Sequence, residues 1–159
     1  MDDITTPENR SRMMAGIRGK NTRPEMLVRR ALFERGFRYR LHDRRLAGTP
    51  DLVLSRYRAV VFVHGCFWHG HDCCFFRWPA TRAEFWRAKI MRNREVDSGA
   101  REALRASGWR VLTVWECALR GRSDEQRQAV YDAAADWIRG PVPELTLDWE
   151  LTRPNAVSD

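Results

Sequence analysis

Residues 64–74 (HGCFWHGHDCC) carry three histidines and three cysteines within eleven positions. Cysteine thiolates and imidazole nitrogens are the ligands that zinc prefers, and a structural zinc site takes four of them in a closed tetrahedron. This segment offers three ligands, and a fourth can come from Cys117 if the strand before it runs beside the strand before the segment. The predicted zinc ligands are Cys66, His71, Cys73 and Cys117.

This zinc set has alternatives. Cys74 or His69 could replace one member, because both lie in the same segment. The cysteines could also be reduced thiols packed in a core without a metal. Metal binding is favoured over disulfides because three of the four cysteines are bunched together and the N-terminus (MDDITTPENR) lacks the apolar stretch of a secretion signal.

A second group of residues combines a candidate metal ligand with candidate proton-transfer groups. The turn at residues 48–51 (GTPD) puts a carboxylate at the head of an apolar strand, next to the strand that ends at His64. Mg²⁺ takes hard oxygen ligands and keeps several waters, so Asp51 is predicted to anchor a catalytic Mg²⁺; a plain turn-forming role is the alternative. His64 and His69 are left over for proton transfer, which is worth roughly 10²- to 10⁴-fold in rate; the alternative for each is a purely structural histidine.

Aromatic side chains form a third feature. Phe67 and Trp68 lie between the proposed zinc ligands, and Trp86 lies near the start of a helix that also carries Arg82 and Arg87. Large rings on a rigid loop can wedge between bases, because stacking on the rings offsets the cost of unstacking the duplex. The alternative is that Phe67 and Trp68 only cover the zinc site.

The charge distribution indicates a polyanionic partner. The net charge is +7, and it arises in residues 1–60, which hold 14 Lys/Arg against 7 Asp/Glu, whereas residues 61–159 hold 14 of each. Of the 28 basic residues only Lys20 and Lys89 are lysines, so the positive face consists of guanidinium groups that can hold phosphates bidentately. A merely solvated arginine-rich surface is the alternative.

These residues need a scaffold to bring them together. The 159 residues suffice for one domain, and the absence of a run of about 18 apolar residues favours a cytoplasmic protein. Hydrophobic periodicity predicts helices over residues 22–36, 81–106 and 123–138, and strands over residues 37–42, 51–55, 59–64 and 109–116. This order predicts an α/β fold with a mixed β-sheet flanked by helices.

Two of these helices begin at a capping-box pattern, at residues 22–25 (TRPE) and 81–84 (TRAE). The N3 position of such a box is enough to explain Glu25. Residues 7–19 predict a marginal helix with three arginines, a candidate DNA-contacting arm. The chain thus divides into an N-terminal arm (1–20), a central domain (21–139) and a C-terminal tail (140–159).

Four motifs together resemble one family. GTPDLVL, VVFVHGCFWHGHDC, PATRAEFW and GWRVLTVWECALRGR closely resemble the very-short-patch repair (Vsr) endonucleases, over about residues 8–139. The resemblance implies a restriction-endonuclease-like fold for the central, endonuclease domain. It also implies a Mg²⁺-dependent nick 5′ to the T of a T:G mismatch that arises when 5-methylcytosine deaminates.

The resemblance also implies roles for the catalytic residues. Asp51 matches the metal-binding aspartate, and Glu25 matches an acidic residue tied to the water shell of the metal. His64 and His69 match the histidines that flank the scissile phosphate. Val63 stands where the family has a threonine, at a position whose backbone carbonyl is associated with the metal; a carbonyl ligand survives this exchange, whereas a hydroxyl contact does not.

Other positions match the zinc and DNA-binding residues of the family. The zinc ligands match Cys66, His71, Cys73 and Cys117, which leaves Cys74 as a bystander. The aromatic wedge inserted from the major groove matches Phe67, Trp68 and Trp86. Met14 falls where the N-terminal helix of the family reaches the minor groove.

The expected partner is double-stranded DNA with a T:G mismatch. By resemblance, the mismatch-repair protein MutL and a companion cytosine-5 methyltransferase are further partners of a monomer that works at the bacterial nucleoid. Two other functions stay open: a restriction-type or less context-dependent nicking nuclease, and a non-catalytic, zinc-stabilised DNA-binding module.

Overall fold

A computed structural model describes residues 20–151, so Met14 and the rest of the predicted arm before Lys20 lie outside the described residues. The helices are α2 (Arg23–Glu34), α3 (Ala83–Ala106) and α4 (Asp124–Arg139). The strands are β1 (Arg40–Leu41), β2 (Leu52–Leu54), β3 (Ala59–His64), β4 (Arg110–Trp115) and β5 (Glu144–Leu147), and the 3₁₀ turns are η1 (Ser55–Tyr57), η2 (Glu116–Ala118) and η3 (Trp149–Leu151). Within residues 20–151, no helix is long and apolar enough to span a membrane.

The five strands form one sheet in the order β1-β2-β3-β4-β5. β1, β2 and β3 pair antiparallel, whereas β3, β4 and β5 pair parallel. The predicted mixed sheet is therefore confirmed. In the β3–β4 register His64 lies opposite Trp115, so the segment after His64 and the turn that carries Cys117 leave the sheet side by side.

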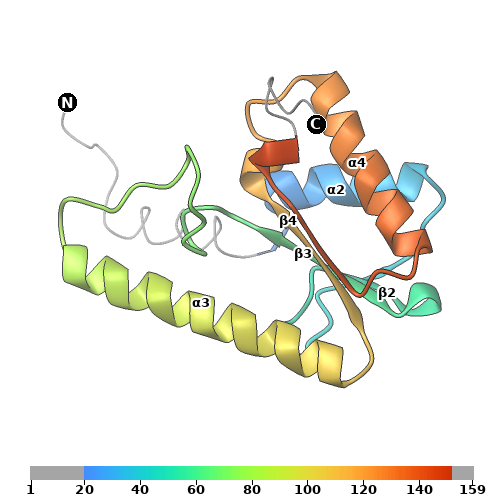
Figure 1. The fold of residues 1–159 in the computed structure, drawn as a ribbon, viewed down its shortest axis with the longest axis horizontal. Helices are drawn as coiled ribbons and strands as arrows, with labels where there is room; N and C mark the ends of the chain where they lie inside the picture. The colour runs from blue at the N-terminus through green and yellow to red at the C-terminus, as the bar shows by residue number, and fades with distance from the viewer. Residues whose placement is uncertain (1–19, 152–159) are drawn as a thin grey trace.

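Helices cover both faces of the sheet, with α3 on one face and α2 and α4 on the other (Figure 1). Alternate residues of the central strands serve the two faces: Val60 and Phe62 pack on the α3 side, and Ala59 and Val61 pack on the side of α2 and α4. Because both faces are buried, the strands read as continuous apolar runs in the sequence. The predicted α/β fold with flanking helices is confirmed.

Local details differ from the sequence-based expectations. The capping box predicted at residues 81–84 does not form, because Arg82 is the N-cap in a left-handed conformation and its side chain makes no capping hydrogen bond. A capping box forms instead at Ser123 and Gln126 at the start of α4. The segment from residue 140, predicted as a tail, supplies β5.

Candidate active site and metal clusters

A cleft of about 1120 Å³ opens at the end of the sheet where β2 begins and β3 ends. It collects most of the residues predicted to act on DNA. The predicted residues that line it are Glu25, Asp51, Val63, His64, Phe67, Trp68 and His69. His42 and Asp97 line it as well.

The position of Asp51 follows from the strand register. The pairing of β2 with β3 ends at Leu52 and Val61, so on the β2 side β3 has no strand partner at Val63, although β4 still pairs with it on the other side. The N–H of Val63 donates to Oδ2 of Asp51 at 2.7 Å, and the side chain thereby takes the place of a strand partner. Asp51 is held against the end of β3, at the edge of the cleft.

Glu25 and His42 complete a carboxylate cluster with Asp51. Thr22 caps α2 through the N–H of Glu25, and this leaves the Glu25 carboxylate, in a residue only 1% exposed, to face inward. Nε2 of His42 lies 3.0 Å from each carboxylate oxygen of Glu25 and 3.9 Å from Oδ1 of Asp51. The three residues offer ligand atoms that all lie within 4.8 Å of one another.

The electrostatics of the carboxylate cluster favour a cation. Burial raises the pKa of Asp51 to about 8, against the effect of the Val63 N–H, and the nearby charge of Glu25 adds to the increase. Glu25 already pairs with Arg29 at 3.2 Å, and a cation beside Asp51 would offset the cost of desolvating its charged form. Carboxylate oxygens are hard ligands, so the cluster fits Mg²⁺.

His64 and His69 stack beside the carboxylate cluster, with ring centroids 3.8 Å apart. Burial, with the charge of His69 as a smaller cause, lowers the pKa of His64 to about 3, so this ring is neutral near pH 7. Nδ1 of His69 lies 2.5 Å from Oδ2 of Asp97 on α3. Burial raises the pKa of Asp97, but the hydrogen bond and charge of His69 outweigh it and the net change is downward. The ionised Asp97 can only accept, so Nδ1 carries the proton and Nε2 is left for chemistry.

The four predicted zinc ligands form a cysteine cluster: Cys66, His71, Cys73 and Cys117, with ligand atoms within 4.8 Å of one another. All cysteines are free thiols, and Cys66 and Cys117 are completely buried. Four N and S donors at this separation fit a tetrahedral zinc ion. The alternative ligands lie elsewhere, because Cys74 is exposed and His69 pairs with Asp97.

The loop between the two clusters rests on α3, whose N-terminal half extends past the sheet (Figure 1). Asn93 donates to the carbonyl of Trp68 at 2.8 Å, and Arg94 donates to the carbonyl of Gly70. Gly70 has φ +63°, and a Cβ there would lie 2.5 Å from a methyl carbon of Ile90. The loop needs glycine at this point because it passes so close to the helix.

The three aromatic residues predicted to enter DNA pack on one another. The ring of Phe67 lies 5.1 Å from that of Trp68 and 5.3 Å from that of Trp86, between centroids. Trp68 is buried, whereas Phe67 and Trp86 are partly exposed. Phe67 and Trp68 line the cleft, and Trp86 supports them from α3.

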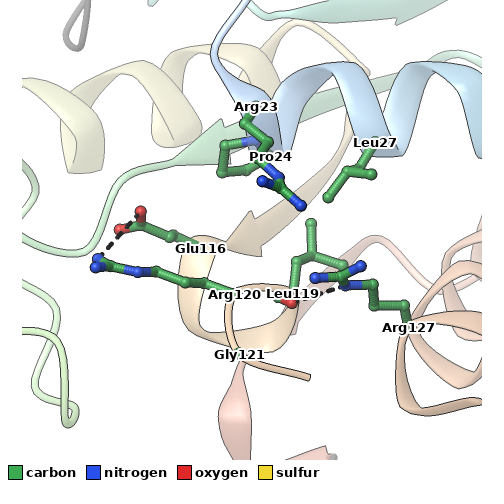
Figure 2. A pocket seen from close by; sticks show the side chains of 8 residues that line it. All are labelled: Arg23, Pro24, Leu27, Glu116, Leu119, Arg120, Gly121 and Arg127. Atoms are coloured by element: carbon green, nitrogen blue, oxygen red, sulfur yellow. Dashed lines mark hydrogen bonds and ion pairs between the residues drawn. The ribbon is translucent and has the colours of Figure 1, made fainter. Parts of the chain in front are cut away.

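A smaller pocket of about 280 Å³ adjoins the cleft and shares Arg23, Pro24, Glu116 and Arg120 with it. Figure 2 shows the guanidinium groups of Arg23, Arg120 and Arg127 around this pocket. Glu116 pairs with Arg120 at 3.8 Å, and Arg127 donates to the carbonyl of Leu119. Among residues 20–151, Arg23 has no ion-pair partner. The pocket thus extends the cleft with an excess of positive charge.

The sequence offers little sign of two residues in this site. His42 ends an alternating run and follows β1, and only folding brings it against Glu25, seventeen residues earlier. Asp97 lies in the middle of α3, where an acidic residue is usually part of a solvated face, yet its partner His69 is twenty-eight residues away. Asn93 and Asp97 lie one turn apart, so they share a face of α3. This spacing is a weak sign that both contact the same loop.

Comparisons with known proteins place the chain among DNA endonucleases. The family described as DNA mismatch endonuclease Vsr matches residues 2–75. The chain is 42% identical over 148 residues to the DNA mismatch endonuclease Vsr of Escherichia coli strain K12, covering 93% of this chain and 95% of the relative. It is 50% identical over 119 residues to the type II nicking enzyme V.XorIIP of Xanthomonas oryzae pv. oryzae, covering 75% and 88%, and 47% identical over 123 residues to the type II nicking enzyme V.NmeAIP of Neisseria meningitidis, covering 77% and 88%.

Proposed function

Because the chain belongs to the Vsr family of DNA mismatch endonucleases, we propose that it nicks one strand of duplex DNA 5′ to the T of a T:G mismatch in a Mg²⁺-dependent reaction. Its task is then very-short-patch repair of deaminated 5-methylcytosine. The observation that carries the proposal is the pairing of Glu25 and Asp51 in the same cleft as the stacked His64 and His69. A pair of carboxylates, one buried and one at the edge of the cleft, suits a cation, and the imidazoles suit proton transfer.

The residues that would hold Mg²⁺ are Asp51 directly, Glu25 through the water shell, and the backbone carbonyl of Val63. The N–H and carbonyl of one strand residue point to the same side, and the Val63 N–H already meets Asp51, so the carbonyl faces the site too. The valine side chain is compatible with this role because only the backbone is used. When bound, Mg²⁺ neutralises charge that develops on the scissile phosphate and makes bound water a better nucleophile.

The histidines would handle protons around the phosphate. Asp97 holds His69 with Nδ1–H toward itself, so Nε2 can take a proton from the attacking water or give one to the leaving oxygen. His64 is neutral and stacks on His69, which keeps the reactive ring in one orientation. Proton transfer from a positioned imidazole is worth roughly 10²- to 10⁴-fold in rate.

DNA contacts would come from two surfaces beside the chemistry. The aromatic residues Phe67, Trp68 and Trp86 would enter the duplex next to the mismatch, on a loop fixed by zinc in the cysteine cluster. The arginines around the smaller pocket (Figure 2) would bind backbone phosphates of the same duplex.

The proposal is tested with labelled duplexes that contain a T:G mismatch in varied sequence contexts, incubated with and without Mg²⁺. We expect one nick, 5′ to the T, only in the presence of Mg²⁺. Matched T:A and C:G duplexes of the same sequence are the controls. If none of the mismatched duplexes is nicked, the proposal is wrong.

A restriction-type or less context-dependent nicking nuclease is the second candidate, because relatives that are 50% and 47% identical are named type II nicking enzymes. This function predicts a nick in matched DNA at a defined site. Mapping the product ends on matched and mismatched duplexes separates the two functions. Partnership with MutL and with a cytosine-5 methyltransferase, and work at the nucleoid, would follow from the repair role.

A further inference from the structure

The segment that follows β5 closes over the cysteine cluster. Leu147, the last residue of β5, lies opposite Val114 in the parallel pairing with β4, and β4 leads into the turn that holds Cys117. The sheet register therefore delivers the next residue, Asp148, to the cluster. Its Oδ2 lies 3.6 Å from Nε2 of His71.

The two ring nitrogens of His71 face different groups. Nδ1 lies 3.5 Å from Sγ of Cys117, inside the cluster, whereas Nε2 faces Asp148 outside it. The ring stacks on Trp115 with centroids 4.2 Å apart and planes 12° apart, so rotation is restricted. An imidazole that binds a metal through one nitrogen commonly donates its other N–H to a carboxylate.

Asp148 is itself held in place. Its Oδ1 accepts from the N–H of Glu150 at 3.0 Å, and its carbonyl accepts from the N–H of Leu151 at 3.3 Å. The same segment also packs on a second part of the cluster, because the turn η3 that follows Asp148 contacts the turn η2 that holds Cys117.

We propose that Asp148 is a positioning residue of the zinc site, which fixes His71 with Nδ1 toward the metal and Nε2–H toward the carboxylate. Docking of the segment after β5 is then part of zinc binding. The inference rests on the proposed zinc site, and it gives the C-terminal region a role that its sequence does not show.

Zinc affinity of the full-length protein tests this role. Competition with a chromogenic chelator measures the Zn²⁺ dissociation constant of the wild type, Asp148→Ala and Asp148→Asn. Loss of such an outer carboxylate costs roughly 10- to 100-fold in metal affinity, and we expect this for Asp148→Ala. A smaller loss is expected for Asp148→Asn, because its amide oxygen still accepts from His71. The matched control is Glu150→Gln, an exposed neighbour on the same segment, which should bind zinc like the wild type.

Nuclear magnetic resonance of ¹⁵N-labelled histidine supplies a readout that a merely structural role would not change. The zinc-loaded wild type should show His71 metal-bound at Nδ1 with a protected proton on Nε2, and Asp148→Ala should lose that protection while Nδ1 stays bound. Unchanged zinc affinity in Asp148→Ala, or metal bound at Nε2, overturns the role of Asp148 and leaves the zinc site standing. A wild-type protein that binds no zinc overturns the zinc site and this inference together.

Discussion

The cysteine cluster and the carboxylate cluster could each hold a metal ion, but one is closed and the other is open. Three of the four cysteine-cluster ligands come from residues 66–73, and none of the four lines the large cleft. Glu25, His42 and Asp51 come from three separate parts of the chain, and all line the cleft. A closed set of four ligands stabilises a fold, whereas an open set leaves room for water and substrate. The difference predicts that damage to one cluster costs stability and damage to the other costs chemistry.

Asp51→Asn is the variant with the largest expected effect, and it tests whether the carboxylate cluster carries the chemistry. Removing the carboxylate that holds the cation should cost several kcal/mol in the transition state, which is on the order of 10³-fold or more in nicking rate. Duplex binding, measured by fluorescence anisotropy, should change little because the basic surfaces remain. Asp136→Asn, on the exposed face of α4, is the control. Full nicking activity in Asp51→Asn would remove the open cluster from the chemistry.

Cys117→Ser should produce the opposite pattern. Loss of a zinc ligand should remove the metal and destabilise the fold by on the order of 3 kcal/mol, which lowers Tm by roughly 6–12 °C in a chain of this size. Thermal unfolding and metal analysis measure the two effects, and exposed Cys74→Ser is the control. Full zinc retention in Cys117→Ser would point to another ligand.

Asp97→Asn tests how much the carboxylate that holds His69 contributes to the nicking rate. The amide cannot hold His69 as a carboxylate does, so the nicking rate should fall by roughly 10- to 100-fold, a part of what proton transfer contributes. Single-turnover kinetics at saturating enzyme isolate this step from binding. A rate equal to that of the wild type would show that His69 does not need Asp97.

The remaining expected effect is a pH dependence of stability in Mg²⁺-free buffer. The pKa of Asp51 is about 8 in the folded chain and about 4 when unfolded, so between these values unfolding releases a proton. Stability should therefore fall as pH rises from 4 to 8, by at most about 1.4 kcal/mol per pH unit. Urea unfolding of the wild type should show this slope, and Asp51→Asn should lack that part of it. Equal slopes in the two proteins would contradict a buried, protonated Asp51.

Local patterns in the sequence were enough to predict much of the molecule. Periodic apolar residues predicted α2, α4, β2, β3 and β4, because burial on one or both faces leaves its period in the sequence. The cysteine-cluster ligands 66, 71 and 73 were predictable because they lie within one loop. Cys117 followed from a single assumption, that β3 and β4 are neighbours, which the register confirms.

Tertiary structure alone decided which groups surround these residues. The local pattern explained Glu25 as a helix cap and only the family resemblance linked it to the metal, whereas the folded chain turns its carboxylate toward His42 and Asp51. The sequence assigned no partner to His69 and placed residue 148 in a tail, whereas the sheet and α3 bring Asp97 to His69 and β5 brings Asp148 to His71. Periodicity records that a face is buried, but it does not record what lies opposite. The partners of buried charges, which decide where protons and cations sit, therefore depend on the packing of distant segments.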